Sequence, residues 1–193
     1  MNFLFVCGGS AGHINPAISI AEEVSRRSPE SNILFSGADK ELEKRLVPAA
    51  GFHLVNIKMS GLRRGFSPRD IIHNLKTAGN LVTAYFKTKK LIKEFKPDAV
   101  IGTGGYISYP VLKRAAGAGI RTYIMEPNAY PGLAVKMLSG TADRIFVSYP
   151  GTEDRYEKPE RVIFTGTPLR SGFFKENDSS EIVKEKIDME KIS

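Results

Sequence analysis

Short apolar runs recur along the chain, and each is followed by a stretch in which apolar residues return at helical spacing. The first run, Asn2–Cys7, is almost wholly apolar and leads into a helix-like segment. Short strands that alternate with helices indicate a parallel sheet covered on both faces. The pattern predicts strands at Asn2–Cys7, Asn32–Phe35, His53–Ile57, Ala99–Ile101, Thr122–Met125, Arg144–Val147 and Val162–Phe164.

Helical patterns fill most of the gaps between these strands. The pattern predicts helices at about Asn15–Arg27, Lys40–Ala50, Pro68–Phe95, Ser108–Ala116 and Gly132–Ser139, with a short one near Thr152. Right-handed crossovers then give a doubly wound, Rossmann-like α/β domain. The composition changes after Arg170 to a polar, charged segment that is not another strand–helix unit. We therefore expect the domain to occupy residues 1–166 and a linker with a helix to occupy residues 167–193.

The charge balance favours an anionic partner. The 193 residues carry a net charge of +7, which suits a nucleic acid, an anionic membrane surface or a phosphate-bearing substrate, although a solvated basic surface is the plain alternative. The basic residues do not come with a recognisable nucleic-acid-binding fold, so we expect no nucleic-acid partner. The single cysteine, Cys7, excludes an internal disulfide. Without a signal-peptide pattern or a spanning segment, the chain is expected to be soluble and cytoplasmic.

The segment "CGGSAGH", residues 7–13, lies at a predicted strand-to-helix turn. Ligands bind at the carboxyl ends of strands in open α/β sheets, glycine lets the backbone approach them, and a helix N-terminus attracts phosphate. The spacing is not G-x-G-x-x-G, so a dinucleotide is not favoured, and a tight turn without a ligand remains an alternative. His13 is either a general base at the mouth of the sheet or a helix-capping or buried histidine.

Four further loops follow other predicted strands, and the first of them repeats the arrangement of strand, Gly-rich loop and helix. "GTGGYISYP" is Gly-rich, "EPNAYPG" places Glu126 and Asn128 at a strand end, and "SGLRRG" and "GTPLR" add arginines, including Arg170. Small residues and arginines on one rim predict a site for a phosphorylated ligand. The three histidines are scattered and the cysteine is single, so we expect no metal.

The long helix predicted at Pro68–Phe95 has two apolar faces. The stripe expected to face the core contains Leu81, Ala84, Leu91, Ile92 and Phe95. The second face contains Leu75, Ala78, Val82, Tyr85 and Phe86, near Lys76, Lys87, Lys89 and Lys90. Either a neighbouring loop or subunit covers this second face, or Leu75, Val82, Tyr85 and Phe86 dip into an anionic membrane surface.

Taken together, the motifs resemble those of one bacterial family. "GGSAGHINPA", "SGLRRG", "GTGGYISYP", "EPNAYPGLAVK" and "GTPLR" occur in the order and spacing of the N-terminal half of the MurG family. That family transfers N-acetylglucosamine (GlcNAc) from UDP-GlcNAc to undecaprenyl-pyrophosphoryl-muramoyl-pentapeptide (lipid I, giving lipid II) in peptidoglycan and cell-wall synthesis, with roles in cell shape and division. The resemblance covers about residues 1–170.

The resemblance implies the GT-B arrangement, in which two Rossmann-like domains enclose the active site. The N-terminal domain would receive the lipid-linked acceptor and meet the cytoplasmic side of the bacterial inner membrane as a peripheral protein. The C-terminal domain would supply most contacts to the UDP-sugar, and residues 167–193 would lead to it. The chain would then be the acceptor and membrane half of a hexosyltransferase, inactive alone and without a cofactor.

The family's functional residues map onto this chain by motif. Ser10, Ala11 and Gly12 would face the donor sugar and the diphosphate, and His13 would deprotonate the 4-hydroxyl of the acceptor. The resemblance also places Asn128 and Arg170 at the donor and Tyr106 and Glu126 near the acceptor, with Glu126 as the second catalytic candidate. Two departures stand out: Ala11 replaces a glycine of the family's "GGTGGH", and "MEPN" replaces "HEQN".

Two other functions remain open at this point. A related lipid or antibiotic glycosyltransferase would share the fold but take another acceptor. An acceptor-binding, membrane-docking subunit of a split, two-chain glycosyltransferase would have no activity until a donor-binding partner joined it.

Overall fold

The computed structural model describes residues 1–59, 65 and 67–170. Each predicted strand is present, which confirms the α/β class. The strands are β1 (Asn2–Val6), β2 (Asn32–Gly37), β3 (His53–Asn56), β4 (Ala99–Gly102), β5 (Arg121–Glu126), β6 (Arg144–Val147) and β7 (Val162–Phe164).

The strands form one parallel sheet of seven, in the order β3-β2-β1-β4-β5-β6-β7. After β1 the chain adds strands outward on one side, and from β4 it adds them outward on the other. The order therefore reverses between β1 and β4. In open α/β sheets the loops at such a reversal splay apart on the carboxyl side and leave room for a ligand.

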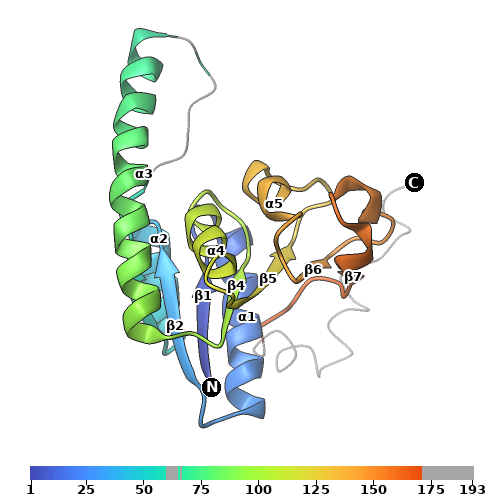
Figure 1. The fold of residues 1–193 in the computed structure, drawn as a ribbon. Helices are drawn as coiled ribbons and strands as arrows, with labels where there is room; N and C mark the ends of the chain where they lie inside the picture. The colour runs from blue at the N-terminus through green and yellow to red at the C-terminus, as the bar shows by residue number, and fades with distance from the viewer. Residues whose placement is uncertain (60–64, 66, 171–193) are drawn as a thin grey trace, which may run out of the picture.

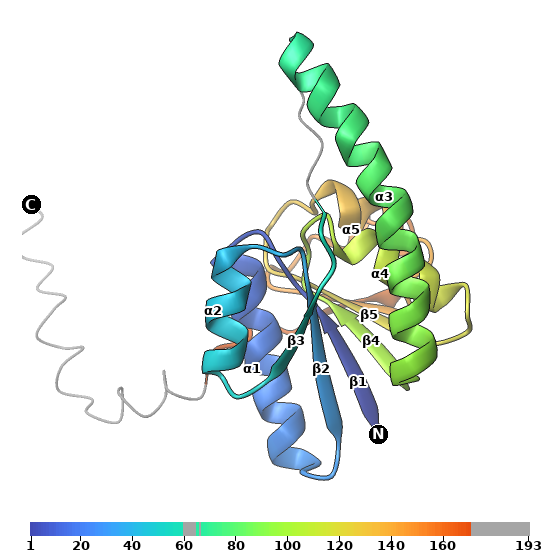
Figure 2. The ribbon, with the colours of Figure 1, turned by 90° about the vertical axis from the view of Figure 1, so that its left-hand side faces the viewer.

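The helices cover both faces of the sheet, as the prediction of a doubly wound fold requires. Figure 2 shows α1 and α2 on one side of the strands and α3, α4 and α5 on the other. Two single-turn 3₁₀ helices, Glu153–Arg155 and Pro159–Arg161, precede β7. The α-helices are α1 (Ala11–Arg27), α2 (Glu41–Ala49), α3 (Pro68–Phe95), α4 (Ser108–Ala116) and α5 (Leu133–Leu138).

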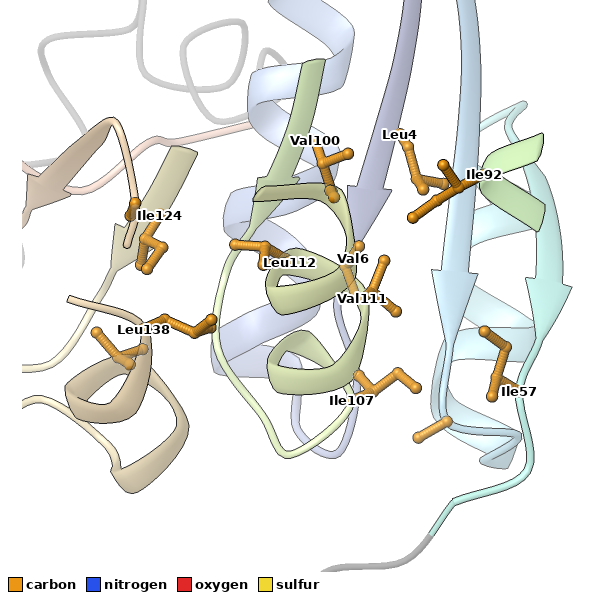
Figure 3. Packing of buried hydrophobic residues seen from close by; sticks show 14 of the residues in the cluster. Leu4, Val6, Ile57, Ile92, Val100, Ile107, Val111, Leu112, Ile124 and Leu138 are labelled. Carbon is orange, nitrogen blue, oxygen red and sulfur yellow. The ribbon is translucent and has the colours of Figure 1, made fainter. Parts of the chain in front are cut away.

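The core is divided by the sheet into two clusters of buried side chains. Under α1 and α2, Phe5 stacks on Phe35 with ring centroids 5.2 Å apart, and Cys7 is fully buried as a small hydrophobe. Under the other helices, Leu4, Val100 and Leu112 belong to the larger cluster (Figure 3). Burial of this kind stabilises the fold by roughly 25 cal/mol per Å² of apolar surface.

Helix α3 confirms the predicted core face wherever its side chains are described. Ala84, Leu91 and Ile92 are buried. On the second face, Tyr85 and Phe86 are 46% and 63% exposed, so no other described residue covers this part of that face. The side chains of Leu75 and Val82 lie outside the described residues. Figure 1 shows α3 projecting well beyond the rest of the domain.

The structure corrects one boundary that matters for the site. Helix α1 begins at Ala11 and not at about Asn15, so Gly12 and His13 belong to its first turn. The apolar periodicity starts only where the helix meets the sheet, and the small residues before it carry no such pattern. The linker and helix expected in residues 167–193 stay a prediction, because residues 171–193 lie outside the described part of the chain.

Candidate functional site

Two glycine-rich loops meet where the strand order reverses. The loop after β1 and the loop after β4 pack so closely that a β-carbon on Gly105 would lie 2.6 Å from the carbonyl oxygen of Gly8. A β-carbon on Gly104 would likewise lie 2.7 Å from Nδ1 of His13. The absence of side chains at these glycines is what lets the two loops touch and lets the histidine lie between them.

His13 occupies the first turn of α1, beside the second glycine loop. Its backbone carbonyl accepts a hydrogen bond of 2.5 Å from Oγ1 of Thr103, which ties the start of the helix to the end of β4. Its Nδ1 is buried and has no hydrogen-bond partner among the described residues. The residue that precedes the helix is Ser10, and the described residues show no capping bond from the His13 ring, so the capping interpretation loses support.

A cavity of about 550 Å³ opens at this end of the sheet. It brings together six of the residues that the sequence predicted: Ser10, Ala11, Gly12 and His13 from the first loop and helix, Asn128 after β5, and Arg170 after β7. The remaining lining residues are Asn15, Pro16, Ser19, Pro127, Thr167, Pro168 and Leu169. Tyr106 and Glu126 do not line this cavity.

Glu126 is a buried carboxylate that is already occupied by its own loop. It accepts hydrogen bonds from the backbone N–H of Asn128 at 3.0 Å, from the Asn128 side-chain amide at 2.7 Å and from the backbone N–H of Gly132 at 3.0 Å. The side chain is 1% exposed. This geometry suits a residue that orients Asn128 better than one that exchanges a proton with a substrate.

Arg170 lines the cavity, and an acidic side chain on α1 partly neutralises its positive charge. Its guanidinium forms an ion pair of 3.1 Å with Glu22 on α1. That pair also fixes the segment after β7 against α1, so it closes one side of the cavity. The arginines of Ser60–Gly65, which the sequence also assigned to this rim, lie outside the described residues.

Tyr106 lies on the second glycine loop and is half-buried. Burial raises the pKa of its phenol, and the negative charge of Glu43 raises it further. Glu43 itself is a residue that the sequence analysis missed. It is fully buried beside the first glycine loop, although the only signal in the sequence is an acidic residue in the first turn of a predicted helix.

Among the described residues, no group of three or more histidine, cysteine or acidic side chains is placed to hold a metal ion. Within the same part of the chain, no helix is long and apolar enough to cross a membrane.

Comparison with known proteins gives a family match over most of the domain. The model of the glycosyltransferase family 28 N-terminal domain matches residues 3–147. A protein of Alkaliphilus oremlandii named UDP-N-acetylglucosamine--N-acetylmuramyl-(pentapeptide) pyrophosphoryl-undecaprenol N-acetylglucosamine transferase is 39% identical over 188 residues. The alignment covers 97% of this chain and 50% of that protein, so the chain spans about half the length of this relative.

Two solved structures share the fold. Acinetobacter baumannii MurG matches with a TM-score of 0.70 and 21% identity, over 92% of this chain and 49% of that chain. A UDP-N-acetylglucosamine 2-epimerase matches with a TM-score of 0.63 and 17% identity, over 86% and 48%. These likenesses concern the fold, which two different chemistries share. The family match rests on the sequence itself, and by that match the chain belongs to glycosyltransferase family 28 as an N-terminal domain.

Proposed function

We propose that this chain is the acceptor-binding half of an inverting transferase that moves GlcNAc from UDP-GlcNAc to the 4-hydroxyl of the muramoyl-pentapeptide on undecaprenyl pyrophosphate. The observation that carries the proposal is the position of His13 on the wall of the cavity at the carboxyl end of the sheet, with a buried Nδ1 that has no hydrogen-bond partner among the described residues. The name of the 39% identical relative supplies the reaction and both substrates.

In this reaction His13 acts as the general base. The acceptor 4-hydroxyl gives its proton to the imidazole, its oxygen forms a bond to the anomeric carbon, and the bond from that carbon to the UDP oxygen breaks. UDP leaves with the electron pair, and the anomeric centre is inverted. Because Nδ1 is buried against Gly104, Nε2 is the ring nitrogen that receives the proton.

The other cavity residues bind and orient. The first turn of α1, with Ser10, Ala11 and Gly12, offers backbone N–H groups to phosphate. Asn128 and Arg170 face the donor, and Glu126 holds Asn128 in place. Tyr106 lies toward the acceptor. A C-terminal half like that of the relatives supplies most contacts to UDP, so this chain is inactive without it.

The role of His13 is tested in a fusion of residues 1–170 to the C-terminal half of the Alkaliphilus oremlandii relative. His13→Ala should lower kcat on the order of 100- to 10,000-fold, because a general base acts in the transition state. The KM for UDP-GlcNAc should change little. Transfer of radiolabelled GlcNAc to the lipid acceptor measures both constants.

The matched control is His53→Ala. His53 is exposed at the first residue of β3, at the opposite end of the sheet from the cavity, so its loss should leave turnover unchanged. A His13→Ala enzyme with a lower melting temperature and near-normal turnover would exclude the base and leave the histidine a structural role.

We also propose that α3 holds the protein on the anionic cytoplasmic face of the bacterial inner membrane. Ile71 and Ile72 are 53% and 55% exposed, and Tyr85 and Phe86 are exposed further along the helix. Lys87, Lys89 and Lys90 follow directly and are exposed to solvent. Exposed apolar side chains next to lysines suit a helix that lies in a lipid headgroup layer.

Vesicle sedimentation tests this surface. Replacing both Tyr85 and Phe86 by serine should abolish binding to vesicles that contain anionic lipid, and binding by the unaltered chain should weaken with salt because charges are screened over about 10 Å at 0.1 M. Phe164→Ser, which removes a 52% exposed aromatic ring from the edge strand β7, is the control and should bind normally. If the double variant binds as well as the control, α3 is not the membrane surface.

A further inference from the structure

Glu43 is a fully buried carboxylate for which the proposed reaction has no role. It lies in the first turn of α2, and its side chain is 0% exposed. Burial of a carboxylate is costly unless hydrogen bonds compensate it. Its partners therefore indicate what the side chain is there to hold.

Both carboxylate oxygens accept backbone hydrogen bonds. Oε1 accepts from the N–H of Lys40 at 3.0 Å, which is an ordinary contact at the start of a helix. Oε2 accepts from the N–H of Gly9 at 3.3 Å, across 34 residues of sequence. The carboxylate fits between two further glycines, because a β-carbon on Gly8 or Gly37 would lie 2.8 Å or 2.9 Å from its oxygens.

The Gly9 N–H belongs to the same peptide group as the Gly8 carbonyl. The two ends of a trans peptide point in opposite directions. Glu43 therefore holds one side of this peptide, while the carbonyl on the other side lies against Gly105 of the second glycine loop. A single peptide group is thus held between α2 and the loop that follows β4.

The second loop extends this set of contacts to the catalytic candidate. Gly104, the neighbour of Gly105, lies directly against the His13 imidazole. Tyr106 follows Gly105 in the sequence, and the negative charge of Glu43 helps to raise the pKa of its phenol. One buried carboxylate is therefore connected to both glycine loops and, through them, to His13 and Tyr106.

We propose that Glu43 is a positioning residue: by fixing the peptide between Gly8 and Gly9 it sets the spacing of the two glycine loops and thereby the place of His13. Its importance for turnover rests on the proposed function, in which His13 is the base. Its effect on the loops does not, and the two can be measured separately.

The test begins with Glu43→Gln in the 193-residue chain. Glutamine has one acceptor oxygen, so its amide NH₂ must face the N–H of either Gly9 or Lys40 and one bond is lost. The His13 ring resonance in an NMR spectrum should move, and the buried thiol of Cys7, which adjoins Gly8, should react with a disulfide reagent on the order of tenfold faster. Glu41→Gln is the control, because that side chain is 94% exposed on the same helical turn and should change neither.

Turnover is then measured in the fusion enzyme. Glu43→Gln should lower kcat with little change in the KM for UDP-GlcNAc, and Glu43→Asp, one methylene too short to reach Gly9, should not restore it. If circular dichroism shows that the glutamine variant is unfolded, the aspartate variant, which keeps the charge, takes its place in the NMR and thiol measurements.

A folded Glu43 variant with an unmoved His13 resonance would overturn the proposal. If His13→Ala lowers kcat, a Glu43 variant with a moved resonance and an unchanged kcat would refute the importance of Glu43 for turnover. Failure of His13→Ala to affect turnover would instead refute the base assignment, and the NMR result would still decide whether Glu43 sets the loops.

Discussion

Glu126 and Glu43 are both buried carboxylates near the carboxyl edge of the sheet, and they brace loops in different ways. Glu126 ends β5 and binds N–H groups two and six residues further along its own loop. Glu43 lies on a helix and binds a loop that is 34 residues earlier in the sequence. The first carboxylate organises one turn, and the second connects separate parts of the fold.

This difference determines how far a disturbance should travel. Loss of the local bonds of Glu126 should loosen only the loop after β5. Loss of the long-range bond of Glu43 should change the distance between two loops that are far apart in the sequence. The Glu43 carboxylate binds the N–H side of a peptide whose carbonyl lies against the second glycine loop. The site is therefore expected to be more sensitive to changes at the loop contact than to changes within the loop after β5.

The largest effect is expected from Gly105→Ala, which breaks the loop contact itself. The new β-carbon would meet the Gly8 carbonyl oxygen at 2.6 Å, and Gly105 has φ +77°, where a side chain is strained. Backbone strain and overpacking together should lower the free energy of unfolding by about 3 kcal/mol. Urea denaturation of the chain measures this loss.

Gly119→Ala is the control that separates the cost of the steric clash at Gly105 from the cost of its backbone conformation. Gly119 has nearly the same φ, +73°, but nothing lies within 4 Å of its added β-carbon. Its cost should be the conformational part alone, about 1 kcal/mol. Equal losses for the two variants would mean that the loops can move apart freely, and the contact would then have no energetic weight.

A smaller effect is expected from Glu126→Gln. The glutamine keeps one acceptor oxygen and sets its NH₂ group against either the donors of Asn128 or the N–H of Gly132, which should lower the free energy of unfolding by about 1–2 kcal/mol. The disturbance should stay local: the amide resonances of Asn128 and Gly132 should shift while those of Gly9 and Gly105 stay in place.

Glu160→Gln is the control for the charge change, because that side chain is 70% exposed and should alter neither stability nor the loop. Shifts at Gly9 in the Glu126 variant would show that the two braces communicate, and the distinction between a local and a long-range carboxylate would fail.

Much of the fold could be predicted from the sequence because its signals are local. Apolar runs of strand length, separated by helical periodicity, were sufficient to place all seven strands. The predicted start of α1 was wrong because the first turn of the helix, with Gly12 and His13, faces the cavity and has no apolar periodicity. The order of the strands, and hence the reversal between β1 and β4, depends on long-range pairing that no local pattern records.

The same distinction between local patterns and long-range contacts applies to the residues of the site. His13, Asn128 and Arg170 could be predicted because they follow strands, and parallel strands end at one edge. The ion pair of Arg170 with Glu22 and the bond of Glu43 to Gly9 could not, since each joins residues from distant parts of the chain. The inward direction of Glu43 depends on the missing side chains of Gly8 and Gly37, a match that appears only in three dimensions.

The smallest predicted effect concerns Cys7, which adjoins the peptide that Glu43 holds. Burial, and secondly the charge of Glu43, raise the pKa of its thiol above the ordinary value of 9.0. Above pH 9 the unfolded chain therefore releases a proton that the folded chain keeps, so stability falls as pH rises and is unaffected below pH 9. Between pH 9 and 10 this thiol alone should lower the free energy of unfolding by about 1 kcal/mol. The range ends at the ordinary tyrosine pKa of 10.0, which limits the contribution of tyrosines.

Urea denaturation at pH 9 and pH 10 measures this slope, which is how much the free energy of unfolding changes between them. The same change measured for Cys7→Ala is subtracted, so the absolute stabilities of the two proteins need not match. The alanine variant loses packing at every pH but has no thiol to titrate, so its stability should change less between the two pH values. Glu43→Gln should keep most of the slope, because burial is the larger cause of the raised pKa and the carboxylate is the smaller. If the glutamine variant lost the whole slope, the thiol would have become solvated, and Glu43 would then be what keeps this end of β1 closed to water.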